Sequence, residues 1–104
     1  MFKIATWNVN SLKVRLPHVL QWLEKEKADV LALQETKSTD ENFPIDAINQ
    51  AGYQVSFTGQ KTYNGVAIIS KHQIQTISKN IPNYSDPQKR VLVVNIENIT
   101  ILNI

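Results

Sequence analysis

Residues Val30 to Lys37 read VLALQETK, and this stretch predicts the architecture around it. Four apolar residues in succession, Val30 to Leu33, are typical of a short strand that is buried on both faces. The strand ends at a polar pair, Gln34 and Glu35. Because strands of this kind occur mainly in sheets covered on both sides, we expect an α/β fold.

The segments before this strand predict a strand-helix-strand unit. Phe2 to Asn8 is rich in strand-forming residues, and Pro17 to Glu26 has apolar residues at helical spacing, with Pro17 near the first helical position. Two strands joined in this way usually run parallel with a right-handed crossover. Asn8 and Glu35 are therefore expected at the carboxyl ends of neighbouring strands.

The rest of the chain predicts a second short helix and several strands. Pro44 precedes this helix and Gly52 ends it. We find no repeat and no internal linker, so residues 1–104 are expected to form one unit with a mixed sheet and flanking helices. The expected strands are Tyr53–Thr58, Val66–Ser70, Ile74–Lys79, Val91–Glu97 and Ile99–Ile104, the last two joined tightly near Glu97 and Asn98.

Composition limits the chemistry that the chain can support. The absence of cysteine excludes disulfides and thiolate metal sites and favours hard cations such as Mg²⁺. A net charge of +2 and a pI of about 9.0 suit a protein that approaches polyanions, although many enzymes of small metabolites share them. The first residues lack the apolar run of a signal peptide or membrane span, so we expect a cytoplasmic protein with no membrane partner.

Polar side chains follow the two predicted parallel strands. In open α/β sheets, ligands gather outside the carboxyl ends of the strands, and Asn8, Asn10 and Glu35 fall in this zone. A carboxylate beside amide oxygens suits Mg²⁺, which binds one or two carboxylates and keeps several waters. In an arbitrary sequence, loop capping by Glu35 and turn closure by Asn8 are the better explanation of the same residues.

A third polar cluster, Tyr63-Asn64-Gly65, lies between two predicted strands. An Asn-Gly pair is typical of a tight hairpin, so turn chemistry alone explains Asn64 and Gly65. In the functional alternative, Gly65 lets backbone amides approach a phosphate, and Tyr63 offers a hydroxyl group or a stacking face.

Together, three motifs resemble the exonuclease III type apurinic/apyrimidinic endonucleases, a family of Mg²⁺-dependent DNA repair nucleases. The motifs are Thr6–Arg15 (TWNVNSLKVR), Leu33–Lys37 (LQETK) and Tyr63–Ile68 (YNGVAI), which match in wording, order and separation. The likeness extends from Met1 to about Ile104. It implies the N-terminal part of a four-layer α/β sandwich of the DNase I-like kind, in which helices flank two packed sheets and the active site lies across one end.

The resemblance also implies a metal site. Glu35 matches the carboxylate that binds Mg²⁺, with Mn²⁺ as the alternative ion. Asn8 matches the asparagine beside it, which orients a catalytic aspartate and is sometimes counted in the metal sphere. Asn10 falls where some members carry an aspartate. On this basis, Asn8 and Glu35 are the expected catalytic residues of the chain.

The same resemblance implies double-stranded DNA as the partner. Family members cut the phosphodiester 5′ to an abasic site, and many also remove nucleotides or blocking groups from 3′ ends. Lys37 matches a basic residue near the metal, whose charge would help to draw in phosphate. For the lone basic residues, a solvated surface charge is a nearly equal explanation. The positions that match DNA contacts are Arg15, Lys37, Tyr63, Asn64, Gly65 and Arg90.

The likeness ends before several residues that the family uses in catalysis. The family places a tyrosine, an aspartate with an asparagine, and a final aspartate-histidine pair beyond Ile104. Neither His18 nor His72 matches the catalytic histidine, and we interpret both as surface or packing residues. The β-branched end at Ile104 leads us to expect a partial domain, truncated at its C-terminal end, that supplies one sheet of the sandwich, whose inner face lies open unless something covers it.

Three functions are consistent with these observations. The first is an abasic-site nuclease, monomeric when complete, of which this chain is the front part. The second is a catalytically incomplete fragment that binds DNA or a partner through the exposed sheet. The third is a phosphatase of the same superfamily, which the fold alone does not exclude. The DNA repair branch is favoured by the residue sequence of Trp7–Arg15 and by the position of Lys37 directly after Glu35-Thr36.

Overall fold

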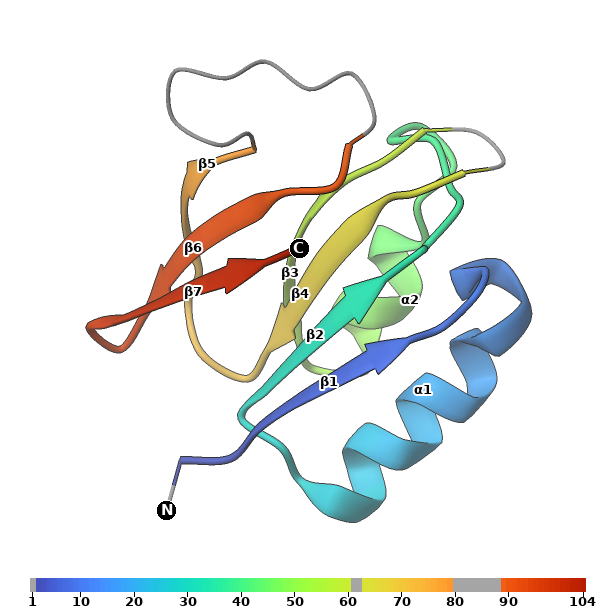
Figure 1. The fold of residues 1–104 in the computed structure, drawn as a ribbon. Helices are drawn as coiled ribbons and strands as arrows, with labels where there is room; N and C mark the ends of the chain where they lie inside the picture. The colour runs from blue at the N-terminus through green and yellow to red at the C-terminus, as the bar shows by residue number, and fades with distance from the viewer. Residues whose placement is uncertain (1, 61–62, 80–88) are drawn as a thin grey trace.

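The protein is described by a computed structural model over residues 2–60, 63–79 and 89–104, and its elements form three layers (Figure 1). Two helices cover one face of a four-stranded sheet, and a three-stranded sheet covers the other face. The elements are β1 (Ile4–Asn8), α1 (Leu12–Glu26), β2 (Val30–Gln34), α2 (Ile45–Gln50), β3 (Gln54–Thr58), β4 (Val66–Ser70), β5 (Gln75–Ser78), β6 (Leu92–Ile96) and β7 (Ile99–Asn103).

The four-stranded sheet contains the predicted parallel pair. Its strand order is β1-β2-β4-β3. Strands β1 and β2 are parallel, with Ile4 opposite Val30 and Asn8 opposite Gln34, whereas β4 is antiparallel to both of its neighbours. The predicted mixed-sheet α/β fold is therefore confirmed, and β1 and β2 end at the same edge.

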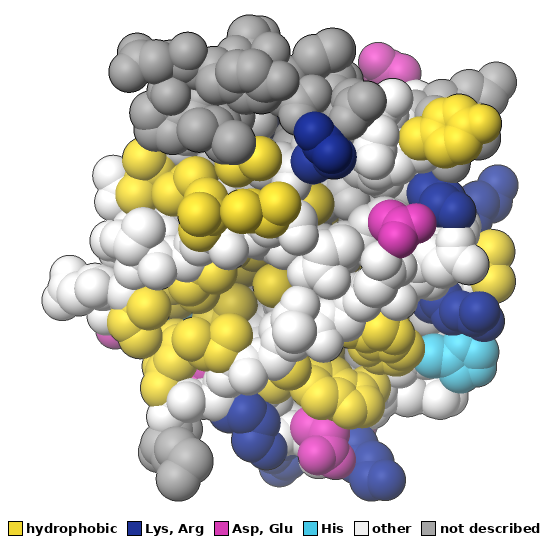
Figure 2. All heavy atoms as spheres, in the orientation of Figure 1, with side chains coloured by type: hydrophobic (Ala, Val, Ile, Leu, Met, Phe, Trp, Pro, Cys, Tyr) yellow, Lys and Arg dark blue, Asp and Glu magenta, His cyan; other side chains and the backbone are white. Residues whose placement is uncertain are grey.

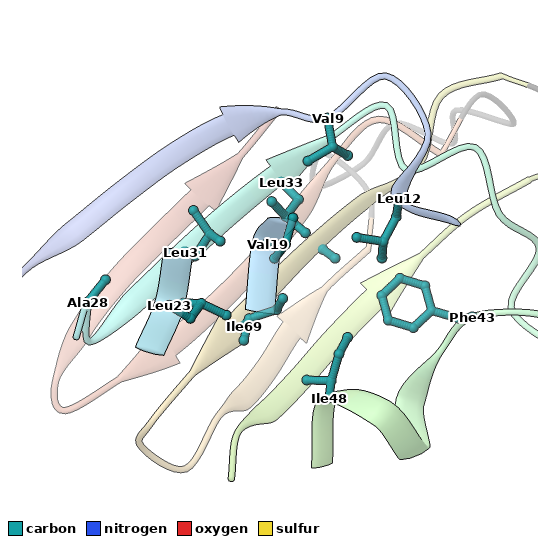
Figure 3. Packing of buried hydrophobic residues seen from close by; sticks show 11 residues of the cluster. Val9, Leu12, Val19, Leu23, Ala28, Leu31, Leu33, Phe43, Ile48 and Ile69 are labelled. Atoms are coloured by element: carbon teal, nitrogen blue, oxygen red, sulfur yellow. The ribbon is translucent and has the colours of Figure 1, made fainter. Parts of the chain in front are cut away.

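Strand β2 is buried on both faces, as its continuous apolar run predicts. Leu31 and Leu33 pack against the helices, whereas Val30 and Ala32 pack against the second sheet. Figure 3 shows the helix side, where Leu31, Leu33 and Ile69 point into the layer that holds residues of α1 and α2. Each fully buried leucine of this kind contributes about 1.5–3 kcal/mol through the hydrophobic effect.

The second sheet corrects the expectation that the inner face lies open. Its order is β5-β6-β7, and the alternate β6 residues Leu92, Val94 and Ile96 are buried against β2 and β4. The expectation was wrong because the apolar alternation of β6 supplies a core face of its own. Ile4 on β1 still fits this expectation in part, since it is 48% exposed.

Helix α1 begins earlier than its proline predicts. It starts at Leu12, whose side chain is fully buried and whose backbone N–H donates to the carbonyl of Thr36. Pro17 therefore lies inside the helix, although proline favours the first turn. The tertiary contacts of Leu12 outweigh that preference. Among the described residues, α1 is the longest helix with 15 residues, and no described helix could cross a membrane.

The turn between β6 and β7 confirms the tight connection expected there. Glu97 and Asn98 join Ile96 to its partner Ile99, and their φ angles are 51° and 65°. Two successive residues with positive φ are typical of a type I′ turn, whose twist matches that of the flanking strands. This hairpin fixes the register of β7 and so determines which of its residues face the first sheet.

Candidate active site

The carboxyl ends of β1 and β2 bring together the two side chains that were expected there. Asn8 is the last residue of β1 and lies opposite Gln34, and Glu35 follows Gln34 directly. The Nδ2 amide of Asn8 donates a hydrogen bond to Oε2 of Glu35 at 2.5 Å. The parallel register produces this pair, because neighbouring parallel strands end at the same edge of the sheet.

Two further polar residues extend the pair into a network. Oδ1 of Asn8 accepts a hydrogen bond from the backbone N–H of Asn10 at 3.2 Å, and Oδ1 of Asn10 accepts one from Nζ of Lys37 at 2.5 Å. The same ammonium group lies 3.9 Å from Oε1 of Glu35. Figure 2 shows an acidic side chain close to basic ones over this end of the molecule. The cluster thus places one negative charge beside one positive charge.

Backbone hydrogen bonds hold the loop after β2 between two other loops. On one side lies the loop after β1, and on the other lies the segment before β4. The bonds run from Ser11 N–H to Glu35, Leu12 N–H to Thr36, Thr36 N–H to Gly65 and Lys37 N–H to Asn64, with N···O distances of 2.8, 2.9, 3.1 and 2.9 Å.

The same loop has an unusual backbone conformation. Glu35 and Lys37 have φ angles of 54° and 53°, in the left-handed region that L residues rarely adopt. Each such residue costs about 1–3 kcal/mol, and strain of this kind concentrates at functional sites. The loop therefore keeps its shape because the hydrogen bonds on both sides offset the strain.

Gly65 fits this arrangement because it has no side chain. Its φ is 92°, and a Cβ atom there would lie 2.2 Å from Oγ1 of Thr36. The Asn-Gly pair does not form the tight hairpin that the sequence suggests, since residues 59–65 connect β3 to β4. Its carbonyl groups instead accept hydrogen bonds from the loop that carries Glu35. Thr36 is buried in this contact and was missed in the sequence, where a lone threonine gives no signal.

A pocket of about 360 Å³ opens over the cluster. Among the residues that line it, Glu35 has the only acidic side chain, and Arg90 contributes a positive charge from the segment before β6. Five of the expected site residues thus share one cavity, together with three residues that were not expected there. The lining consists of Asn8, Gln34, Glu35, Asn64, Gly65, Val66, Arg90 and Ile104.

The remaining expected DNA-contact residues do not line this pocket. Lys37 lines a neighbouring groove of about 650 Å³, which also contains Lys13 and Asn42. Arg15 is exposed on α1, and Tyr63 is 66% exposed; neither lines the pocket. Lys13 was not singled out in the sequence, although it belongs to the Thr6–Arg15 motif.

The oxygen donors at this edge suit a hard divalent cation held by few protein ligands. The Glu35 side chain is 46% exposed, so carboxylate oxygen is accessible from the pocket. Oδ1 of Asn8 already accepts a hydrogen bond from Asn10, and Oδ1 of Asn10 accepts one from Lys37. The roles of these two oxygens as metal ligands therefore stay predictions. No group of three or more histidine or acidic residues able to hold a metal occurs in the described part of the chain. Mg²⁺ is commonly bound by one or two carboxylates, with waters and phosphate oxygens as the other ligands.

A second polar cluster lies at the opposite end of β2. Oδ1 of Asp29 contacts Nε2 of His72 at 2.9 Å, and Oδ2 accepts a hydrogen bond from the backbone N–H of Lys3 at 2.7 Å. That backbone hydrogen bond, followed by the one with His72, lowers the pKa of Asp29 below its ordinary value of 3.8. Phe2 stacks on the His72 ring, which also lies 3.4 Å from Oε1 of Glu97. His72 therefore packs as expected, and His18 is exposed on α1.

Comparison with known proteins places this geometry in a family. The Endonuclease/Exonuclease/phosphatase family matches residues 5–104. An exodeoxyribonuclease III of Haemophilus influenzae is 36% identical over 97% of this chain and 40% of its own length. The chain thus spans about 40% of the length of this curated relative.

Solved structures agree in fold over nearly all of the chain. An AP endonuclease from Archaeoglobus fulgidus has a TM-score of 0.93 at 38% identity, covering 98% of this chain and 40% of that one. A 3′ phosphatase from Neisseria, bound to a product DNA hairpin, has a TM-score of 0.94 at 42% identity with the same two coverages, 98% and 40%. This chain therefore belongs to the endonuclease/exonuclease/phosphatase family, with an exodeoxyribonuclease III and an AP endonuclease among its relatives.

Proposed function

We propose that this chain supplies the metal-binding edge of a Mg²⁺-dependent DNA repair nuclease. The substrate would be duplex DNA, cut at the phosphodiester 5′ to an abasic site or trimmed at a 3′ end. The observation that carries this proposal is the Asn8–Glu35 pair at the open pocket, inside a fold shared with named nucleases. The protein that contains this chain would work as a monomer.

The proposed chemistry assigns separate tasks to the clustered residues. Hydrolysis of a phosphodiester needs a positioned water, a base and charge neutralisation at the phosphoryl oxygens. A divalent cation supplies Lewis-acid activation of the phosphate when bound. Glu35 would hold it, while the Nδ2 group of Asn8 keeps the carboxylate in one orientation. Lys37 and Arg90 would bring positive charge to the phosphate backbone of the substrate.

Nicking of an abasic duplex by the intact protein tests this proposal. Mg²⁺ should support nicking, chelation should stop it, and Glu35→Gln should lower the rate at least about 100-fold because the charge that holds the cation is lost. Metal-independent nicking, or no nicking, would contradict the proposal. Hydrolysis of a phosphoinositide in preference to abasic DNA would favour a phosphatase of the family instead.

A duplex with a 3′ phosphate is a useful second substrate. One solved relative is a 3′ phosphatase, so the same metal edge would bind and help to hydrolyse a terminal phosphate. Binding without any hydrolysis on either substrate would indicate the non-catalytic alternative. In that case DNA affinity should still fall steeply with salt, because phosphate contacts release counterions.

A further inference from the structure

A buried amide lies between the two sheets, directly beneath the candidate active site. Asn103 is the last residue of β7 and is only 3% exposed. In the β6–β7 register it pairs with Leu92, a core residue that faces the first sheet. The hairpin register therefore directs a polar side chain into a mostly apolar interface. Such placement is costly unless every polar atom finds a partner.

The side-chain hydrogen bonds of Asn103 all lead to the first sheet. Its Nδ2 group donates to the carbonyl oxygen of Leu33 at 2.9 Å and to that of Ala67 at 3.0 Å. Its Oδ1 accepts from Nε2 of Gln34 at 2.8 Å. Only a side chain with two donors and an acceptor in this geometry satisfies all three partners. Asparagine thus joins β7 to β2 and β4 at a single point.

This point adjoins the residues of the metal edge. Gln34 immediately precedes Glu35 and lies opposite Asn8, so its side chain fixes the strand end from which the carboxylate extends. Gln34 also donates to Oγ1 of Thr6 at 2.8 Å, which includes β1 in the same set of bonds. Beyond Asn103, Ile104 lines the pocket itself. Asn103 therefore links the side of the pocket formed by Gln34 to the side formed by Ile104.

We propose that Asn103 is a positioning residue for the metal edge. Through Gln34 and the carbonyl of Leu33, it fixes the strand end that carries Glu35, so that the strained loop presents its carboxylate to the pocket. It does not touch substrate or metal. The inference rests on the proposed function, because it assumes that Glu35 holds a divalent cation.

A second hydrogen bond between the sheets provides a matched control. Oγ of Ser56 on β3 and Oγ1 of Thr76 on β5 lie 2.6 Å apart, and Ser56 is 8% exposed. Neither residue lines the pocket. Ser56→Ala therefore removes a polar link between the same two sheets without reaching Glu35. A purely structural role for Asn103 predicts similar behaviour of Asn103→Ala and Ser56→Ala.

The first measurement needs no metal. Amide hydrogen exchange in the intact metal-free protein reports the loop bonds directly, since Ser11 N–H bonds to Glu35 and Lys37 N–H bonds to Asn64. Asn103→Ala should speed exchange at Ser11 and Lys37 by at least about tenfold relative to Ser56→Ala. Equal exchange at these amides in the two variants would overturn the proposal.

The second measurement is the dissociation constant for Mg²⁺, obtained by calorimetry or by competition with Mn²⁺. Asn103→Ala should weaken binding about 10–100-fold, the usual effect of losing a partner that orients a metal ligand, and Ser56→Ala should not change it. Gln34→Met removes the bonds from Gln34 to Asn103, Thr6 and the carbonyl of Ala32, but it keeps the two bonds from Nδ2 of Asn103, so it should weaken binding less. If Asn103→Ala does not fold, Gln34→Met decides, and unchanged affinity in that variant overturns the proposal.

The two proposals fail in distinguishable ways. If the wild-type protein binds no divalent cation, the proposed function fails whatever Asn103 does. If the wild type binds Mg²⁺, Glu35→Gln abolishes this binding and Asn103→Ala retains full affinity, only the positioning role is wrong.

Discussion

The two ends of β2 each carry a carboxylate in a polar cluster, and they differ in what those carboxylates contact. Asp29, at the amino end, has one oxygen bonded to the backbone of Lys3 and the other to His72. Glu35, at the carboxyl end, accepts one hydrogen bond from Asn8, has its other oxygen 3.9 Å from Nζ of Lys37, and is 46% exposed beside a pocket. A carboxylate whose oxygens are both hydrogen-bonded within the protein stabilises the fold, whereas one with an oxygen outside hydrogen-bond distance of its neighbours can bind a ligand.

The backbones of the two ends differ in the same sense. At the carboxyl end, Glu35 itself and Lys37 have left-handed φ angles, whereas at the amino end the left-handed residue is Lys27, the C-cap of α1, and Asp29 is not among the described residues with positive φ. Extra strain at the end with the less engaged carboxylate is the pattern expected when geometry is selected for function. Substitutions at the Asp29 end should therefore change the stability of the fold, whereas substitutions at the Glu35 end should change ligand binding.

The largest expected effect comes from the glycine that supports the loop. Gly65→Ala should destabilise the protein by about 3 kcal/mol or more, because a Cβ at φ 92° would overlap Thr36 and force the loop away. Gly52→Ala is the matched control, since its φ is 97° and nothing lies within 4 Å of the added atom. Chemical denaturation measures both. Equal losses would show that backbone strain alone acts at Gly65.

The next effect separates the two carboxylates. Glu35→Gln should lower Mg²⁺ affinity at least about 100-fold, more than the usual effect of losing a residue that only orients a metal ligand, while changing the unfolding free energy by less than about 0.5 kcal/mol. Asp29→Asn should leave Mg²⁺ affinity unchanged and reduce stability, because the bonds from Lys3 and His72 favour the charged form. Calorimetric titration with parallel denaturation checks both. A loss of metal affinity in Asp29→Asn would end the distinction between the two ends.

Acid should act on the amino end in a defined direction. The pKa of Asp29 is lowered in the folded state, mainly by the backbone hydrogen bond from Lys3. Its contribution to stability is therefore fully present above the ordinary value of 3.8 and is lost as pH falls through the lower folded value. Denaturation curves recorded from about pH 5 down to well below 3.8 measure this loss of stability. Asp29→Asn should flatten the acid dependence, and an unchanged slope would contradict this assignment.

The smallest effect concerns the exposed ion pair at the carboxyl end. Lys37→Ala should change stability by less than about 1 kcal/mol, because partly exposed pairs contribute little. It should reduce the slope of log affinity for duplex DNA against log salt by about one. Lys71→Ala is the control at the other end, where Nζ donates to the carbonyl of Lys27. Equal slopes for both variants would remove Lys37 from the DNA contacts.

Much of the fold could be predicted because its signals are local. The apolar run Val30–Leu33 predicts a strand buried on both faces, and Asn8 and Glu35 follow at one edge from the parallel crossover. Glu97 and Asn98 predict the last hairpin through their turn chemistry. These features depend on short stretches of sequence and on rules of chain connection.

The features that could not be predicted depend on long-range pairing. The second sheet covers β2 and β4 because β5, β6 and β7 pair with one another, a choice that no single strand signals. Helix α1 begins at Leu12 because of a contact with Thr36, not because of Pro17. The hydrogen bond between Gln34 and Asn103 joins strands that are far apart in the sequence, so neither residue predicts it alone.

The most direct test of this account is an amide NMR titration of the intact protein with Mg²⁺. Shifts should be confined to residues 8–11 and 35–37 and abolished by Glu35→Gln, with no change around Asp29 and His72. Shifts at the Asp29 end, or none at the Glu35 end, would contradict it.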